Sequence, residues 1–268
     1  MPADRAARFL ASAAAAALLA LTAAGCNLTG SETTGSIAST AEPRSEAEWR
    51  RAADTWGERF RSNPNDHEAA IYYAKSLRET GQRAQAVAVL EQAAITHPHD
   101  RALLGAYGRA LADVGRFEQA LDVLSRAHTP AQPDWRILNV QGAVLDQLGR
   151  NQDAQREYSA ALKIAPNEPS VLSNLGLSYA LSKDLKRAEA TLRQAAGQTN
   201  AAPKVRQNLA LVVGLQGRFA EAERIVRADL PPAEAEANAA YLRQMLAERG
   251  ALDKQPAARP RAGKPKAG

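Results

Sequence analysis

The chain is poor in the side chains from which catalytic and metal sites are usually built. It has one cysteine and four histidines in 268 residues, which excludes an intramolecular disulfide framework and leaves few ligands for zinc. No glycine-rich phosphate loop, G-x-S-x-G or H-E-x-x-H sequence occurs. His97, His99 and Asp100 could be read as metal ligands, but they fall in a predicted turn where polar residues are usual. We therefore expect no enzyme activity, no cofactor and no metal site.

Most of the chain also lacks an excess of charge of either sign. The whole sequence carries a formal net charge of +5, which on its own would indicate a nucleic-acid or membrane-surface partner. Residues 253–268, however, hold five basic residues and one acid, and residues 1–25 hold two basic residues and one acid. Residues 26–252 are therefore neutral overall, and we expect no nucleic-acid binding. The Pro-, Ala- and Gly-rich segment 253–268 is expected to be a disordered basic tail.

The N-terminus has the pattern of a secretion signal. Residues 9–21 are almost entirely Ala and Leu and are fewer than the roughly 20 apolar residues of a membrane-spanning helix. The sequence L-T-A-A-G-C that follows resembles a bacterial lipobox, in which the cysteine, here Cys26, is lipidated and the chain is cleaved just before it. The resemblance implies a lipoprotein signal peptide at 1–25. Because Asn27 and not Asp follows the cysteine, it also implies sorting to the outer membrane, on its periplasmic face.

The segment after Cys26 is expected to be a linker. Residues 26–45 are rich in Ser, Thr and Gly, a composition typical of a flexible tether. A lipid on Cys26 would therefore hold a folded periplasmic part close to the membrane. An uncleaved anchor with an incidental cysteine is the alternative.

The rest of the chain repeats with a period of 34 residues. Turn residues recur at this spacing at Gly81, Gly115, Gly149, Lys183 and Gly217. Alanines recur in one phase at Ala86, Ala120, Ala154, Ala188 and Ala222. Apolar and small residues three and four apart on both sides of each turn predict two amphipathic helices per copy.

This pattern resembles the tetratricopeptide repeat, a helix–turn–helix unit of 34 residues. The resemblance implies an all-α, right-handed superhelical solenoid with five full copies over 67–236. A half copy over 46–66 would precede them, and a capping helix over 237–252 would follow. The fourth copy departs most from the pattern, because Lys183 and Asn200 stand where Gly and Pro are usual.

The resemblance also implies a binding surface, because the first helix of each copy lines the concave face of such a solenoid. Asn174 and Asn208 fall where peptide-binding members of the family use Asn to hold a ligand backbone, and an amide can both donate and accept. The neighbouring inward row reads Lys75, Arg109, Ala143, Leu177 and Leu211. We predict a peptide-binding groove made of Asn139, Asn174, Asn208, Arg136, Lys204, Leu177 and Leu211. The alternative is that these Asn residues merely tolerate a partly exposed inner face.

Lipobox, tether and about five such copies together resemble the TadD family, lipoproteins of the tight-adherence (Flp) pilus machines. The resemblance implies a non-enzymatic scaffold at the outer membrane whose partner is a secretin or another component of that machine. An adaptor for peptidoglycan hydrolases or for outer-membrane assembly factors has the same architecture and stays open. An enzyme or nucleic-acid binder would require a basic stripe or a cluster of titratable groups, and the sequence shows neither.

Overall fold

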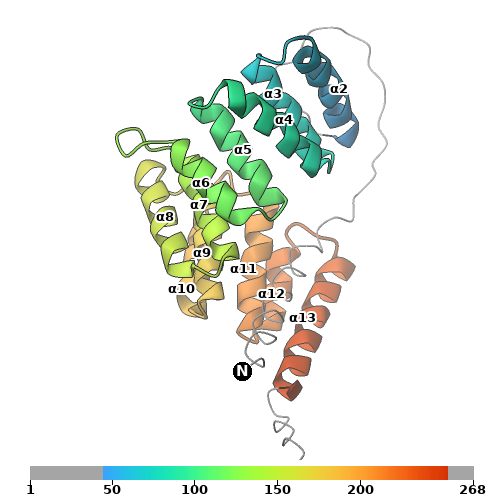
Figure 1. Ribbon diagram of the computed structural model, residues 1–268. Helices are drawn as coiled ribbons and strands as arrows, with labels where there is room; N and C mark the ends of the chain where they lie inside the picture. Colours follow the sequence, from blue (N-terminus) through green and yellow to red (C-terminus); the bar gives the residue numbers. More distant parts are fainter. Residues whose placement is uncertain (1–44, 253–268) are drawn as a thin grey trace, which may run out of the picture. The chain divides into compact units, whose positions relative to one another are not determined.

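The computed structural model describes residues 45–252, and every named element within them is a helix (Figure 1). The helices are α2 (Glu46–Ser62), α3 (His67–Glu79), α4 (Arg83–Thr96), α5 (Arg101–Asp113), α6 (Phe117–Arg126), α7 (Trp135–Gln147), α8 (Asn151–Ile164), α9 (Pro169–Leu181), α10 (Leu185–Ala196), α11 (Pro203–Leu215), α12 (Phe219–Val226) and α13 (Pro232–Leu252). The five pairs from α3/α4 to α11/α12 are numbered copies one to five. Cys26, the expected signal peptide and the basic tail lie outside the described residues.

Acidic side chains start the first helix of four copies, and they share the 34-residue period. Asp66 accepts a hydrogen bond from the Ala69 N–H at 2.9 Å, and Asp100 accepts one from the Leu103 N–H at 3.0 Å. Asp134 and Glu168 cap α7 and α9 in the same way. Each carboxylate satisfies a backbone N–H that has no partner within its helix. In copy five no side chain caps α11, and the helix begins with Pro203, which has no N–H that needs a partner.

The turns inside the copies use left-handed backbone geometry. The four turn glycines have φ between 74° and 81°, and Lys183 in copy four has φ 65°. Lys183 therefore adopts the conformation that glycine supplies elsewhere, at a cost of about 1 kcal/mol for a residue with a Cβ. The departure from the pattern at this position changes the residue but not the turn.

Small residues allow the two helices of a copy to approach closely. A Cβ added at Gly142 would lie 2.5 Å from Cε1 of Tyr158, and one added at Gly176 would lie 2.6 Å from Cγ of Leu192. Tyr158 and Leu192 are buried on the second helix of the same copy. The large residue of one helix thus fills the space left by the missing side chain of the other.

Successive copies stack because the first helix of each copy contacts both helices of the copy before it. Helix α2 packs on α3, where Trp56 stacks on Tyr72 with ring centroids 4.7 Å apart. Helix α13 packs on α11 and α12 and begins at Pro232, ahead of the start expected at 237. Proline is favourable in the first turn because its missing N–H would have no helical partner there. The all-helical repeat architecture expected from the sequence is confirmed.

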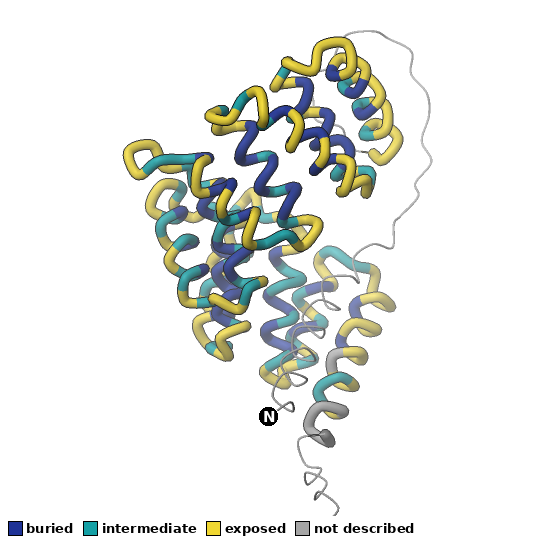
Figure 2. Tube along the Cα trace, in the orientation of Figure 1, coloured by how far each residue is buried: buried dark blue, intermediate teal, exposed yellow. Residues whose placement is uncertain are grey.

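The buried side chains lie between the helices, and the turns are exposed (Figure 2). They form two main clusters that meet at α7. Ile137 and Val144 of α7 belong to the cluster of α2–α6, whereas Leu138 and Leu145 belong to the cluster of α8–α13. Helix α7 therefore contributes buried side chains to both clusters.

Candidate functional site

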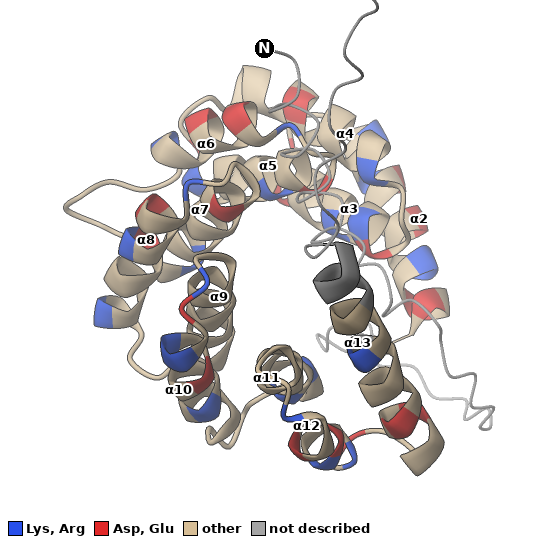
Figure 3. Cartoon of the chain, turned by 90° about the horizontal axis from the view of Figure 1, so that it is seen from below, with Lys and Arg blue, Asp and Glu red and all other residues tan. Residues whose placement is uncertain are grey.

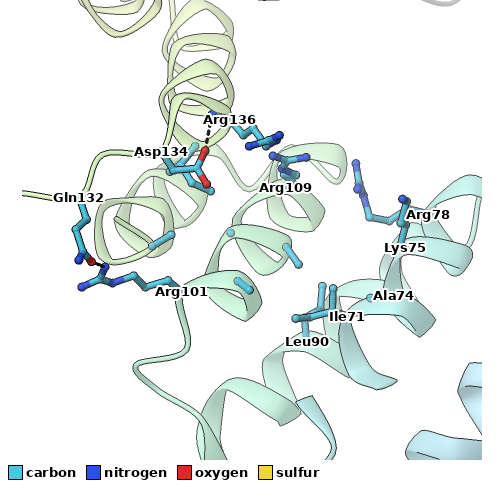
Figure 4. A pocket seen from close by; sticks show the side chains of 15 residues that line it. Ile71, Ala74, Lys75, Arg78, Leu90, Arg101, Arg109, Gln132, Asp134 and Arg136 are labelled. Carbon is cyan, nitrogen blue, oxygen red and sulfur yellow. Dashed lines mark hydrogen bonds between the residues drawn. The ribbon is translucent and has the colours of Figure 1, made fainter. Parts of the chain in front are cut away.

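The first helices of copies one to three, together with Leu90, Ala127 and Gln132, line an open-sided cavity of about 470 Å³ (Figure 4). Its floor is apolar and includes Ile71 of α3, Gly105 and Ala106 of α5, and Ile137 of α7. A Cβ at Gly105 would lie 2.6 Å from Cδ1 of Ile137, so the absent side chain lets α5 and α7 come together below the cavity. Such a floor can receive apolar side chains of a ligand.

Five cationic side chains line the same cavity. Lys75 and Arg78 come from α3, Arg101 and Arg109 from α5, and Arg136 from α7. Figure 4 shows the guanidinium groups of Arg109 and Arg136 beside each other. Arg78 is held by an ion pair with Asp113. These cations come from three consecutive copies, so stacking of the copies brings them together.

Arg109 differs from its neighbours in its partners. It is half-buried, and within residues 45–252 no hydrogen bond or ion pair joins it to another residue. Burial, and then the positive charge of Arg78, lower the pKa of the Arg109 guanidinium below its ordinary value. The negative charges of Asp134 and Asp113 act in the opposite direction, but Asp134 caps α7 and Asp113 pairs with Arg78. A buried charge is costly unless it is paired, so the guanidinium donors of Arg109 are available to a ligand.

The acidic and neutral polar groups of the cavity are largely engaged. Asp134 accepts the Arg136 N–H at 2.7 Å as the cap of α7. On the other side, Gln132 accepts a hydrogen bond from Arg101 Nη1 at 2.5 Å. The cavity therefore has a net positive character, with Asp134 the one acidic side chain among its described lining residues.

The predicted groove residues lie further along the array. Asn174 Nδ2 donates to Asn139 Oδ1 at 2.9 Å, and Asn208 Nδ2 donates to Ser173 Oγ at 2.9 Å. These bonds join the first helices of adjacent copies. All three Asn are half-buried, as are Leu177 and Leu211, whereas Arg136 and Lys204 are exposed. Of the predicted set, only Arg136 lines the cavity.

Of the residues that line this cavity, the sequence assigns only Arg136 to the predicted groove. The 34-residue period places Lys75 and Arg109 on an inward row, but the predicted groove centres on Asn139, Asn174 and Asn208. The signal that could have found the cavity is the pair of cations 34 residues apart, followed by Arg136 at the edge of the next copy. Arg78, Arg101 and Gln132 had no comparable signal.

Two other polar clusters connect helices. Asp146 accepts hydrogen bonds from Tyr158 Oη at 3.1 Å, Asn151 Nδ2 at 2.7 Å and Ser178 Oγ at 2.7 Å. Burial raises the pKa of Asp146, although all three hydrogen bonds act in the opposite direction. This carboxylate joins α7 to α8 and α9, and its three donors account for its position without a ligand.

The second cluster surrounds Glu189 of α10. It accepts hydrogen bonds from Arg193, Arg218 and Gln216 at 2.7 to 2.9 Å. Burial tends to raise the pKa of Glu189, but these three donors outweigh it and lower the pKa to about 2. The cluster joins copy four to copy five, because Gln216 and Arg218 of copy five both donate to Glu189 of copy four.

Asp100, in the turn that carries His97 and His99, has structural partners. His67 Nδ1 lies 2.6 Å from Oδ2 of Asp100, whose Oδ1 caps α5. Among residues 45–252, no three His, Cys, Asp or Glu side chains gather in an arrangement that could hold a metal ion. In the same part of the chain, no helix combines the length and apolarity needed to cross a bilayer.

Three protein-family models match parts of the chain. Residues 140–203 and 205–228 match models described as tetratricopeptide repeat, and residues 51–127 match one described as anaphase-promoting complex, cyclosome, subunit 3. The chain has the tetratricopeptide-repeat fold. None of the curated protein sequences matches it at a significant level.

Solved structures agree with this fold. PilW, a widely conserved type IV pilus biogenesis factor, superimposes with a TM-score of 0.63 at 17% identity, over 75% of this chain and 91% of that one. TTC0263, a thermophilic TPR protein of Thermus thermophilus, gives 0.58 at 22% identity, over 66% and 98%. The APC/C complex Cut9–Hcn1 gives 0.62 at 13% identity, over 74% and 40%. Tetratricopeptide-repeat proteins are generally non-enzymatic scaffolds that bind protein partners. The helix pairs of this chain stack into the same kind of array.

Proposed function

We propose that this chain is a non-enzymatic scaffold that binds a protein partner and assists assembly of a Flp-type, tight-adherence pilus machine. A lipid on Cys26 holds it on the periplasmic face of the outer membrane. The observation that carries the proposal is that the first helices of successive copies present half-buried polar side chains, among them Arg109, Asn174 and Asn208. Such groups can bind the backbone and side chains of a partner segment.

The pilus assignment is supported by two lines of argument. PilW, which shares the fold, is a type IV pilus biogenesis factor. The sequence around Cys26 resembles a lipobox, which is the anchor that a scaffold for an outer-membrane secretin requires. Together they make a secretin, or another component of the pilus machine, the expected partner.

The proposal is tested by affinity purification of the full chain from detergent-solubilised membranes of the producing cell. We expect secretin subunits or other pilus-machine proteins to co-purify. A matched bait carries residues 1–45 fused to an unrelated soluble domain and should not retain them. Enrichment of peptidoglycan hydrolases or outer-membrane assembly factors in place of pilus components would show that the scaffold serves a different client.

A further inference from the structure

We propose that the cavity of α3, α5 and α7 binds an acidic segment of the partner protein. Asp or Glu side chains of this segment pair with Arg109 and Arg136, and its apolar side chains contact Ile71 and Ile137. This inference rests on the proposed function as a protein-binding scaffold, and it specifies the chemistry of the partner at one place in the array. It also places this contact in copies one to three, away from Asn174 and Asn208.

The excess of basic side chains in the cavity favours an acidic ligand. Five basic side chains line the cavity, namely Lys75, Arg78, Arg101, Arg109 and Arg136, and Asp134 is the acidic side chain among its described lining residues. Asp134 already accepts the N–H that starts α7. Arg109 is half-buried and has no ion-pair partner within residues 45–252. A carboxylate entering the cavity can form two parallel hydrogen bonds with a guanidinium, which is the pairing that arginine geometry favours.

The size and the apolar floor of the cavity favour a ligand that also carries apolar side chains. The cavity of about 470 Å³ falls within the range of pockets that enclose a ligand of several side chains. Its floor is made of aliphatic and small residues, among them Ile71, Ala106 and Ile137. A segment that alternates acidic and apolar residues fits both the floor and the cations.

A nucleic acid fits this cavity less well. Polynucleotides require a basic track that follows many phosphates, together with aromatic rings on which bases stack. No aromatic side chain is among the described residues that line the cavity. Over the described helices, Lys and Arg alternate with Asp and Glu and do not form a continuous stripe (Figure 3). The cationic cluster is local, as expected for a short acidic segment.

The C-terminal segment of the chain is also a poor occupant. Residues 253–268 hold five basic residues and one acid, so they carry the same sign as the cavity. This tail therefore does not supply the acidic side chains that the cavity fits, and we assign them to the partner protein.

The experiment measures fluorescence anisotropy of the full chain with a labelled decapeptide of alternating Glu and Leu, amidated at its C-terminus. A matched peptide replaces every Glu by Gln. We expect the Glu peptide to bind at least about tenfold more tightly, because charge-assisted hydrogen bonds to guanidinium are worth about 1.5–3 kcal/mol. Binding should weaken as salt is raised.

The variants locate the site. Arg109→Gln should weaken the Glu peptide about tenfold, as expected for loss of one charge-assisted pair, and Arg109→Lys should recover part of this loss. Arg224→Gln, on the exposed surface of α12, is the matched control and should bind as the parent chain does. Thermal unfolding of each variant checks that it is folded. If Arg109→Gln does not fold, Arg136→Gln replaces it, because Arg136 is exposed and its loss does not disturb the core.

Three results would overturn the inference: equal binding of the Glu and Gln peptides, unchanged binding by the Arg109 and Arg136 variants, or equal displacement of the peptide by a single-stranded oligonucleotide of the same charge. If the parent chain still captures its partner from membranes in any of these cases, only this inference fails and the scaffold function stands. Absence of a captured partner alongside specific peptide binding would instead remove the proposed pilus role.

Discussion

Asn174 of copy four donates a hydrogen bond to Asn139 of copy three, with 2.9 Å between Nδ2 and Oδ1. Asn208 makes the corresponding bond one copy further on, to Ser173. A carboxamide has two N–H donors and an accepting oxygen, so each bond uses only one of the two donors on the donating Asn. These residues can therefore align adjacent first helices and still bind a ligand backbone.

The double replacement Asn174→Ala and Asn208→Ala tests this dual role. Loss of two hydrogen bonds between copies should lower the free energy of unfolding by about 1 kcal/mol for each bond. If a partner backbone is also held there, its affinity should fall by an additional 1–3 kcal/mol or so. Circular dichroism checks that helicity is retained, and titration with the captured partner measures the affinity. Gln152→Ala, on the exposed face of α8, is the matched control. Full affinity in the double variant would place the interface elsewhere, for example on the convex face.

Replacement of Cys26 by Ser tests the lipid anchor. The serine hydroxyl cannot form the thioether that carries the acyl chains, and two or more chains are needed for stable membrane attachment. We expect the variant to leave the outer-membrane fraction, measured by immunoblotting after membrane fractionation. Ser31→Ala, in the expected tether, should remain with the membrane. Retention of Cys26→Ser at parental levels contradicts the lipoprotein assignment.

Gly142→Ala tests the close contact within copy three. The added methyl group would meet Cε1 of the buried Tyr158 at 2.5 Å. We expect a loss of about 1–3 kcal/mol in the free energy of unfolding, because overpacking displaces a fixed ring. Gly197→Ala is the control, because its nearest contact would be at 3.4 Å. Chemical denaturation measures both, and equal stabilities would refute the packing argument.

The lowered pKa of Glu189 predicts that the stability of the fold depends on pH in the acidic range. Its pKa is lowered from 4.5 to about 2 in the folded chain, so the folded state favours the ionised form. The stabilisation is fully present above pH 4.5 and is lost as the pH falls towards 2. In Glu189→Gln, the melting temperature should decline less steeply across this interval than in the parent chain. The exposed Glu236→Gln should keep the parental slope, and a parental slope in Glu189→Gln would contradict the prediction.

The sequence was sufficient for the fold because the repeat is a local pattern. Asp66, Asp100 and Asp134 recur every 34 residues before their helices, and each fulfils the same capping role. Even the departure at Lys183 preserves the turn, with φ 65°. These features depend on neighbours within a few positions along the chain.

The candidate site depends on contacts between copies, which a single sequence does not specify. The bond of Asn174 to Asn139 requires the particular rotation of one copy on the next. The same is true of Arg109: its place on an inward row could be read from the period, but its lack of an ion-pair partner could not. Which cations are neutralised is decided by pairs such as Arg78 with Asp113, 35 residues apart.

The division of the core at α7 has a consequence for how the array opens. Ile137 and Val144 belong to one buried cluster, and Leu138 and Leu145 belong to the other, so the helices on either side can lose their amide protection at different rates. Hydrogen exchange should then show two cooperative blocks that share this helix. A segment bound against Ile137 and Arg136 would hold α7 in place, and occupancy of the cavity should slow exchange in both blocks at once.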